Sequence, residues 1–316
     1  MSEIILEGRG LTRLYTTDTG RTLTACHDVS LSLREGETLG IVGESGCGKS
    51  TLLRLLTQLE RPDKGQLFLQ GKDITNLKGE ALRQNRRNIQ MVLQDPGTAF
   101  FSRIRVKDAV SEPLRNFEKL SSKELDRRVD ELLELVQLPV DFKERYPHAM
   151  SGGQRQRLGI ARALALNPQI LICDESTSAL DVLVQKQIIQ LLVDIQRERK
   201  LSMVFVCHDL ALVQSFSHRI MIMYLGNVVE ILPGKQICED ACHPYSRALL
   251  DSVFTVDMDF SKPIHPLEGE VPSPLDAPDG CVFHTRCPHC TQRCREERPK
   301  LHTVSEEHVV ACHLFE

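Results

Sequence analysis

The 316-residue chain contains no tryptophan, and aromatic residues make up only 5% of it. Proteins that bind single-stranded nucleic acid stack bases on aromatic side chains, so this composition argues against such a role. An excess of one charge is also lacking, because the formal net charge is -4 and the isoelectric point is about 6.3. No basic field points to nucleic acid, whereas 41% hydrophobic residues suffice for a core.

Long apolar runs are missing as well. No run reaches the roughly 18 residues that a membrane-spanning helix needs. The first ten residues, MSEIILEGRG, lack the charged start and the apolar stretch of a signal peptide. We therefore expect a cytoplasmic chain, which could still dock on a membrane protein.

Apolar, strand-like segments alternate with helix-periodic segments through most of the chain. The predicted strands are 38–42, 89–94, 169–175 and 203–209, and the predicted helices begin near Lys49 or span 107–137 and 181–200. This alternation predicts an α/β domain with a mostly parallel central sheet. After about residue 258 the chain becomes rich in proline, so we expect two domains, 1–258 and 259–316.

The segment GESGCGKST follows an apolar strand and opens a helix, which is the context that a phosphate-binding P-loop requires. Glycines let backbone N–H groups wrap the phosphates, Lys49 can reach the β- and γ-phosphates, and the Ser50 hydroxyl can bind Mg²⁺. The residues expected around the phosphates are Gly43, Glu44, Ser45, Gly46, Cys47, Gly48, Lys49, Ser50 and Thr51.

Asp174 and Glu175 stand at the carboxyl end of a predicted buried strand. Two adjacent carboxylates are costly there unless a cation or a reaction uses them. Asp174 is therefore predicted to hold Mg²⁺, and Glu175 to polarise the attacking water. The alternative is a structural N-cap for the segment that follows.

A glycine-rich turn at residues 151–154, SGGQ, precedes a basic helix-periodic run. Unpaired backbone N–H groups at a helix start attract anions, and glycine lets a phosphate come close. The simpler alternative is that Ser151 is an ordinary N-cap and that the glycines only mark the loop.

The order of these motifs resembles that of the ATP-binding cassette (ABC) ATPases. After the P-loop come Gln94 at the end of a buried strand and the glycine-rich turn at 151–154. The strand that ends in Asp174 and Glu175 follows, then the motif SALD at 178–181, and then His208 after another strand. The resemblance covers roughly residues 3–255. It implies a P-loop fold with a mostly parallel central sheet, an antiparallel β subdomain and an α-helical subdomain.

The resemblance also assigns roles in a head-to-tail pair of cassettes. Ser151 and Gly153, with Gly152 and Gln154 beside them, are expected to close on the γ-phosphate held by the other cassette's P-loop. Met150 replaces the leucine that is common before this turn, a swap that conserves volume.

Four further positions match the pattern. Tyr15 resembles the aromatic residue that stacks on adenine, the alternative being a half-buried strand tyrosine. Gln94 is expected to sense Mg²⁺ and the attacking water and to link the site to the membrane partner. Asp181 is expected at the dimer seam, and His208 at the γ-phosphate, where it holds the water geometry.

Within the family, several segments resemble the peptide and nickel importers. They are residues 91–114, 224–230, 242–253 and the tail from residue 266, which is most similar to the C-terminal extension of oligopeptide and dipeptide transporter subunits. The region from Asp95 to Pro113 is then expected to receive a coupling helix of the membrane subunit. Phe100 and Phe101 fit the floor of an apolar groove, or plain core packing.

Eleven cysteines are present, and their distribution is uneven. Cys26, Cys47, Cys173, Cys207, Cys238 and Cys242 are scattered, several of them in apolar runs typical of buried thiols. Cys281, Cys287, Cys290, Cys294 and Cys312 lie in the last 36 residues with the spacing C-x5-C-x2-C-x3-C-x17-C. In a reducing cytoplasm this cluster suggests a metal rather than disulfides.

Four thiolates can close a tetrahedral zinc site or hold an iron–sulfur cluster. The resemblance matches Cys281, Cys287, Cys294 and Cys312 to the ligands of a [4Fe–4S] cluster and leaves Cys290 as a spare thiol or a substitute ligand. The possible ligands His284, His289 and His313 keep zinc open, and a tail without metal is the third alternative. We expect a structural staple rather than a redox centre.

The sequence therefore predicts the ATP- and Mg²⁺-dependent subunit of a membrane importer, peripheral on the cytoplasmic face of the cell membrane. The resemblance implies a second ABC ATPase, either a paralogue or a second copy, two permease subunits and an extracellular solute-binding protein. Peptides are the predicted cargo, and nickel or another small solute is the alternative. A soluble ABC ATPase on ribosomes or nucleic acid is less well supported, because one cassette is present and the acidic pI disfavours nucleic acid.

Overall fold

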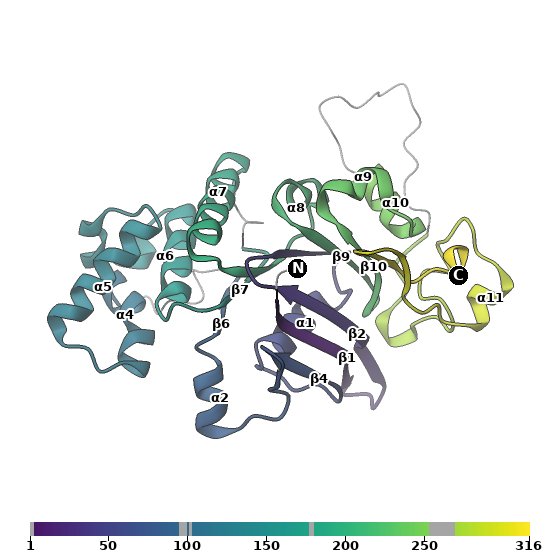
Figure 1. Ribbon diagram of the computed structural model, residues 1–316, viewed down its shortest axis with the longest axis horizontal. Coiled ribbons are helices and arrows are strands. Elements are labelled where there is room, and N and C mark those ends of the chain that lie inside the picture. Colours follow the sequence, from purple (N-terminus) through teal and green to yellow (C-terminus); the bar gives the residue numbers. More distant parts are fainter. Residues whose placement is uncertain (1–2, 95–99, 101–102, 177–179, 253–268) are drawn as a thin grey trace. The chain divides into compact units, whose positions relative to one another are not determined.

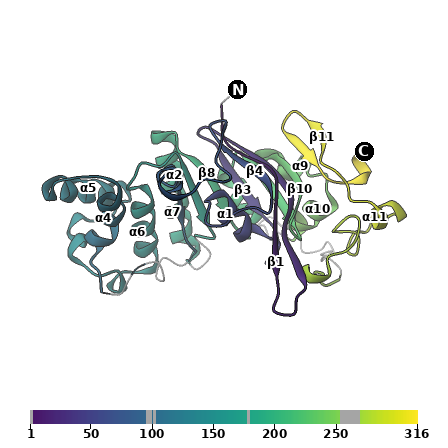
Figure 2. The ribbon, with the colours of Figure 1, turned by 90° about the horizontal axis from the view of Figure 1, so that it is seen from below.

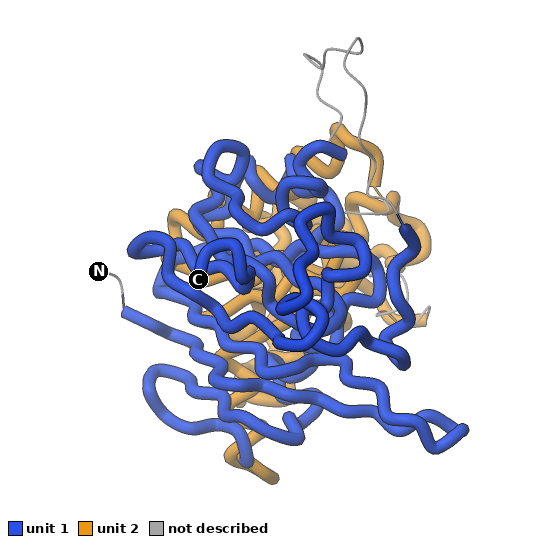
Figure 3. The backbone as a smooth tube through the Cα atoms, turned by 90° about the vertical axis from the view of Figure 1, so that its right-hand side faces the viewer, with its two compact units in different colours: residues 1–76, 206–316 blue, residues 77–205 orange. Residues whose placement is uncertain are grey.

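The computed structural model describes residues 3–94, 100, 103–176, 180–252 and 269–316. The chain divides into two compact units (Figure 3). Unit 1 contains residues 1–76 and 206–316, and unit 2 contains residues 77–205. The C-terminal cysteine segment therefore belongs to the same compact unit as the P-loop.

Unit 1 contains an antiparallel sheet with the strand order β2-β1-β4-β5. Its strands are β1 (Ile4–Thr16), β2 (Thr22–Arg34), β4 (Lys64–Leu69) and β5 (Lys72–Asp73). The first two form the long hairpin visible in Figure 2. Along them buried residues such as Leu6, Leu31 and Leu33 are interspersed with exposed ones, as expected for a sheet with one solvated face.

The second sheet of unit 1 has the strand order β11-β12-β10-β9-β3. Its strands are β3 (Thr38–Val42), β9 (Arg219–Tyr224), β10 (Asn227–Pro233), β11 (His302–Ser305) and β12 (His308–Val310). Among these five strands, as far as the structure describes them, the parallel pair is β3 with β9. The other neighbouring strands of this group pair antiparallel, and Leu225 and Gly226, both with positive φ, close the tight hairpin between β9 and β10.

The helices of unit 1 are short. They are α1 (Lys49–Leu56), α8 (Leu210–Phe216), α9 (Ile237–Asp240), α10 (Pro244–Asp251) and α11 (Gln292–Glu296), with 3₁₀ turns at Gly234–Gln236, Pro274–Asp276 and His313–Phe315. Figures 1 and 2 show the C-terminal segment in yellow beside α10 and β10. This placement follows from the pairing of β12 with β10.

Unit 2 combines a small parallel sheet with a group of helices. The strands are β6 (Ile89–Val92), β7 (Ile170–Asp174) and β8 (Ser202–Val206), which reaches the unit boundary, and β6 pairs in parallel with β7. The helices are α2 (Gly79–Asn85), α4 (Val106–Phe117), α5 (Ser122–Leu135), α6 (Gly152–Leu164) and α7 (Val182–Arg199), with 3₁₀ turns at Val140–Glu144 and Pro147–Ala149. Helices α4, α5 and α6 pack together (Figure 1).

The predicted fold class is confirmed, with two refinements. The central sheet is mixed rather than mostly parallel, because the C-terminal hairpin extends it in antiparallel fashion. The helical stretch 107–137 is two helices, and Ser121 starts the second with a capping box that involves Glu124. The predicted domain boundary between residues 258 and 259 lies outside the described residues. None of the described helices is long and apolar enough to cross a bilayer.

Candidate functional site

The P-loop connects β3 to α1, and its glycines are required by close packing. A Cβ on Gly43 would lie 2.2 Å from the carbonyl oxygen of Met223, and one on Gly48 would lie 2.2 Å from that of Ala25. Both glycines also have positive φ, at 156° and 101°. The loop is thus held against β9 and β2 by backbone contacts that a side chain would break.

Lys49 closes the loop from within. Its side chain is buried, and Nζ donates to the carbonyl oxygens of Gly43 at 2.7 Å and Glu44 at 3.0 Å. In the described chain, no side chain caps the start of α1 and no acidic residue lies in its first turn. Ser50 is exposed in that turn. The ammonium group, the helix N-terminus and the hydroxyl therefore lie at one end of α1, an arrangement that can bind an anion.

Tyr15 lies on β1, opposite Leu23 of β2. Leu23 comes two residues before Ala25, whose carbonyl borders Gly48, so the sheet brings this part of β1 toward the P-loop. The Tyr15 hydroxyl donates to Glu60 at 2.5 Å. The guanidinium of Arg13 lies 4.9 Å from the ring centroid, so one ring face already has a cation partner.

His208 belongs to unit 1 and is exposed in the turn that precedes α8. The next residue, Asp209, starts α8 by accepting a hydrogen bond from the N–H of Leu212 at 3.0 Å. The turn is thereby fixed, with the imidazole on its surface.

Unit 2 brings Gln94 and Glu175 together. Nε2 of Gln94 donates to Oε2 of Glu175 at 2.8 Å. Glu175 has a φ of 42°, a conformation that costs free energy for a residue other than glycine. Asp174 ends the buried strand β7 directly before it. The structure therefore positions the glutamine amide on the carboxylate that sequence analysis assigned to the attacking water.

The turn at 151–154 has the geometry of an ordinary helix start. The Ser151 hydroxyl accepts the N–H of Gln154 at 3.3 Å, and the Gln154 amide accepts the N–H of Ser151 at 2.9 Å. A Cβ on Gly153 would lie 2.6 Å from Cγ1 of Val184 on α7, whereas one on Gly152 would lie 3.4 Å from Leu180. Within the chain, the hydrogen bonds of this turn are therefore those of an ordinary N-cap. Gly153 has a second role, since its lack of a side chain lets α6 pack closely against α7.

Asp181 caps α7, because its Oδ1 accepts the N–H of Val184 at 3.0 Å. The two residues after it, Val182 and Leu183, are 78% and 75% exposed. Residues 178 and 179 of the SALD motif lie outside the described part of the chain, as do 95–99 and Phe101 of the predicted coupling region. Phe100 is buried.

The C-terminal cysteines converge in unit 1. One small cavity is lined by Cys281, Cys287, Cys294 and Cys312 together with His284, His289 and His313, but Cys290 is not among its lining residues. Burial, reinforced by the neighbouring thiols, raises the pKa of Cys281 and Cys287 to about 11 and raises the pKa of Cys312. Thiolates in this arrangement therefore need a cation to be stable.

A second group, Glu230, Cys242 and His308, places three possible ligand atoms within 4.8 Å of one another. Hydrogen bonds account for it without an ion. Both Glu230 oxygens accept bonds, and the Cys242 thiol donates to the carbonyl of Asp240 at 3.3 Å. A glutamate inside the apolar run NVVEILP was the available sequence signal for a buried polar partner.

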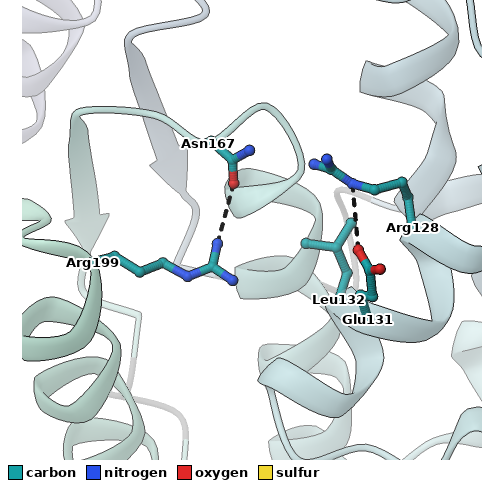
Figure 4. Close-up of a pocket in the computed structure, with 5 residues that line it drawn as sticks. All are labelled: Arg128, Glu131, Leu132, Asn167 and Arg199. Atoms are coloured by element: carbon teal, nitrogen blue, oxygen red, sulfur yellow. Dashed lines mark hydrogen bonds and ion pairs between the residues drawn. The ribbon is translucent and has the colours of Figure 1, made fainter.

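A pocket of unit 2 contains none of the predicted site residues (Figure 4). It is lined by Arg128, Glu131, Leu132, Asn167 and Arg199. Arg199 donates to Asn167 at 3.2 Å, and Arg128 lies 3.9 Å from Glu131. The two arginines that line this pocket thus already interact with other residues of the chain.

Comparisons with known proteins agree with this geometry. The ABC transporter family model matches residues 26–178, and the model of the oligopeptide/dipeptide transporter C-terminal region matches residues 229–294. The chain is 44% identical to the oligopeptide transport ATP-binding protein AppF of Bacillus subtilis, over 99% of this chain and 98% of that protein. It is 45% identical to OppF of Salmonella typhimurium, over 92% and 88%.

Solved structures show the same fold. A dimeric ABC cassette bound to ADP and phosphate is 31% identical, with a TM-score of 0.66 over 72% of this chain and 98% of that one. The cbiO1 protein of Clostridium perfringens has a TM-score of 0.68 at 29% identity, over 76% and 92%. The chain is therefore an ABC-transporter ATPase. Within that class, it belongs to the ATP-binding subunits of the oligopeptide/dipeptide transporter family.

Proposed function

We propose that this chain hydrolyses ATP to drive peptide import through a membrane permease. The observation that carries the chemical part is the 2.8 Å bond between Gln94 and Glu175. It aligns a neutral amide with a carboxylate at the end of β7, so that Glu175 can take a proton from water while Gln94 orients that water. Asp174, Gln94 and the Ser50 hydroxyl are the groups that would hold Mg²⁺, which neutralises developing phosphate charge.

The remaining site residues complete this proposal. The P-loop from Gly43 to Thr51 binds the phosphates, Lys49 leaves the loop carbonyls to meet them, and Tyr15 stacks on the adenine. His208 contacts the γ-phosphate. These roles are supported by the exposed position of His208 and Ser50 and by the anion site at α1.

A head-to-tail pair of cassettes supplies the second half of each site. Val182 and Leu183 support this arrangement, since they form an exposed apolar pair directly after Asp181. Ser151 and Gly152 are also exposed, so their turn is accessible to the other cassette's nucleotide. The partner is a paralogous ATPase or a second copy of this chain.

Transport requires two permease subunits, which the region 95–113 contacts from the cytoplasmic face, and an extracellular solute-binding protein. The matched C-terminal family model and the named peptide transporters AppF and OppF support peptides as cargo over nickel. They also favour a transporter over an ATPase that acts on ribosomes or nucleic acid.

The test is hydrolysis and uptake by the reconstituted complex. We expect Glu175→Gln to retain ATP binding and to abolish hydrolysis and uptake, whereas Lys49→Ala abolishes binding itself. Vesicles should accumulate labelled di- or oligopeptide in an ATP-dependent manner. ATP-dependent uptake of nickel without peptide would refute the cargo, and normal hydrolysis by Glu175→Gln would refute the site.

The four cysteines at one cavity support a metal centre that staples the tail. A single tetrahedral zinc would hold its sulfur ligands about 3.8 Å apart, as bond lengths near 2.3 Å require. The likeness of the tail to the C-terminal region of oligopeptide/dipeptide transporters favours a [4Fe–4S] cluster over a single zinc. Iron and sulfide analysis of anaerobically purified protein tests this. Cys312→Ala should lose the metal, while Cys290→Ala retains it; one zinc per chain would refute the cluster.

A further inference from the structure

Arg286, between two of the clustered cysteines, makes an ion pair with the P-loop. Its Nη1 lies 2.9 and 3.1 Å from the two carboxylate oxygens of Glu44 and 3.4 Å from the Tyr224 hydroxyl. The Arg286 side chain is only 5% exposed, and that of Glu44 is 26% exposed. Removing one partner of such a poorly solvated pair is costly, because the remaining charge is left without a partner where water reaches it little.

Glu44 is held at its main chain as well. Its N–H donates to the Tyr245 hydroxyl at 3.0 Å, and its carbonyl accepts from Lys49. Tyr245 is fully buried and packs edge-to-face against Tyr224, with ring centroids 4.7 Å apart. If Lys49 moves to a phosphate, Glu44 is still held by its ion pair with Arg286 and by the hydrogen bond from its N–H to Tyr245.

The segment that carries Arg286 is anchored by its neighbours. Phe283 is 1% exposed and packs against the same tyrosines, at 5.3 Å from Tyr224 and 5.4 Å from Tyr245. The N–H of Arg286 donates to the carbonyl of Phe283 at 3.0 Å, and the N–H of Cys281 donates to the carbonyl of Cys294 at 2.8 Å. The turn between Cys281 and Cys287 therefore determines where the guanidinium lies.

We propose that Arg286 is a positioning residue for nucleotide binding, through which the C-terminal cysteine segment preorganises the P-loop. The proposal rests on the ATP-binding function given above. A loop already held in its binding shape loses less conformational entropy when the phosphates arrive, so its affinity is higher. Arg286 itself does not touch the nucleotide; it acts through Glu44.

The experiment measures the Kd of a fluorescent Mg²⁺–ATP analogue for the full chain. We expect Arg286→Gln and Glu44→Gln each to raise Kd about three- to tenfold, because the entropy cost of ordering one loop on binding corresponds to a change of about that size. The double variant should be no weaker than either single variant, since both remove the same bond. Arg286→Lys should recover most of the affinity, because one nitrogen makes both carboxylate contacts.

The matched control is Arg293→Gln, an arginine of the same segment that is 52% exposed and paired with Glu297. It should leave Kd unchanged. In the ATPase assay, Arg286→Gln should raise KM with kcat retained. If Arg286→Gln does not fold, Glu44→Gln and Arg286→Lys are measured instead, because both keep a side chain of similar size at the substituted position.

Two results would overturn the proposal: an unchanged Kd with only a lowered melting temperature, or strictly additive losses in the double variant. Failure of the proposed function looks different. In that case the wild-type chain would not bind the analogue, or Lys49→Ala would bind it equally well.

Discussion

Replacing Glu230 by alanine should loosen the C-terminal hairpin from the sheet. Glu230 lies in β10 and is fully buried. Its Oε1 accepts from Nε2 of His308 on β12 at 2.7 Å and from the N–H of Cys242 at 2.6 Å, and Oε2 accepts from the N–H of His243 at 3.1 Å. One carboxylate thus satisfies three groups from two other parts of unit 1.

The magnitude follows from those three donors. A buried donor left without an acceptor costs about 1–3 kcal/mol. The three share one acceptor residue, so their losses do not simply add, and we take about 3–5 kcal/mol as the total. We expect Glu230→Ala to lower the free energy of unfolding by that amount. Glu230→Gln should lose less, because it keeps one acceptor oxygen.

Urea unfolding of the purified full chain, followed by circular dichroism, measures the loss. The control is Glu239→Ala, an exposed carboxylate on α9, which should change stability by less than about 0.5 kcal/mol. Limited trypsin digestion should cleave the tail of Glu230→Ala faster than that of the wild type. A loss below about 1 kcal/mol, with an unchanged digestion pattern, would refute the network as the link between hairpin and sheet.

Two further predictions concern stability. Burial lowers the pKa of His243 to about 3, below its ordinary value of 6.5, so the unfolded chain binds the extra proton. The free energy of unfolding is therefore unaffected by this residue above pH 6.5 and falls by about 1.4 kcal/mol per pH unit as the pH falls from 6.5 toward 3. His243→Asn should remove this part of the pH dependence, measured by unfolding at a series of pH values. Gly153→Ala should destabilise the chain by about 1–3 kcal/mol in thermal or urea unfolding, because its Cβ meets Val184 at 2.6 Å. Gly152→Ala, whose nearest atom is 3.4 Å away, is the control, and equal losses in both variants would contradict the packing argument.

The sequence alone determined the features that depend on neighbouring residues. The strand before Gly43, the helix from Lys49 and the buried strand that ends at Asp174 were predictable, because each rests on a local pattern of apolar residues and turn chemistry. The cap at Ser121 rests on a signal of the same local kind, a serine followed three residues later by Glu124. The order of these motifs along the chain was enough to indicate the ABC ATPase family.

Tertiary structure decided what depends on distant residues. The hairpin β11–β12 joins β10, and the sequence pattern of a strand says which face is buried but not which strand lies beside it. Glu230 and His308 are 78 residues apart, and Glu44 and Arg286 are 242 apart. No local signal encodes such pairs, because they form only when long loops close and burial removes water from both side chains. The cysteine spacing therefore suggested a metal and the family resemblance a ligand set, but only the fold joined that segment to the P-loop.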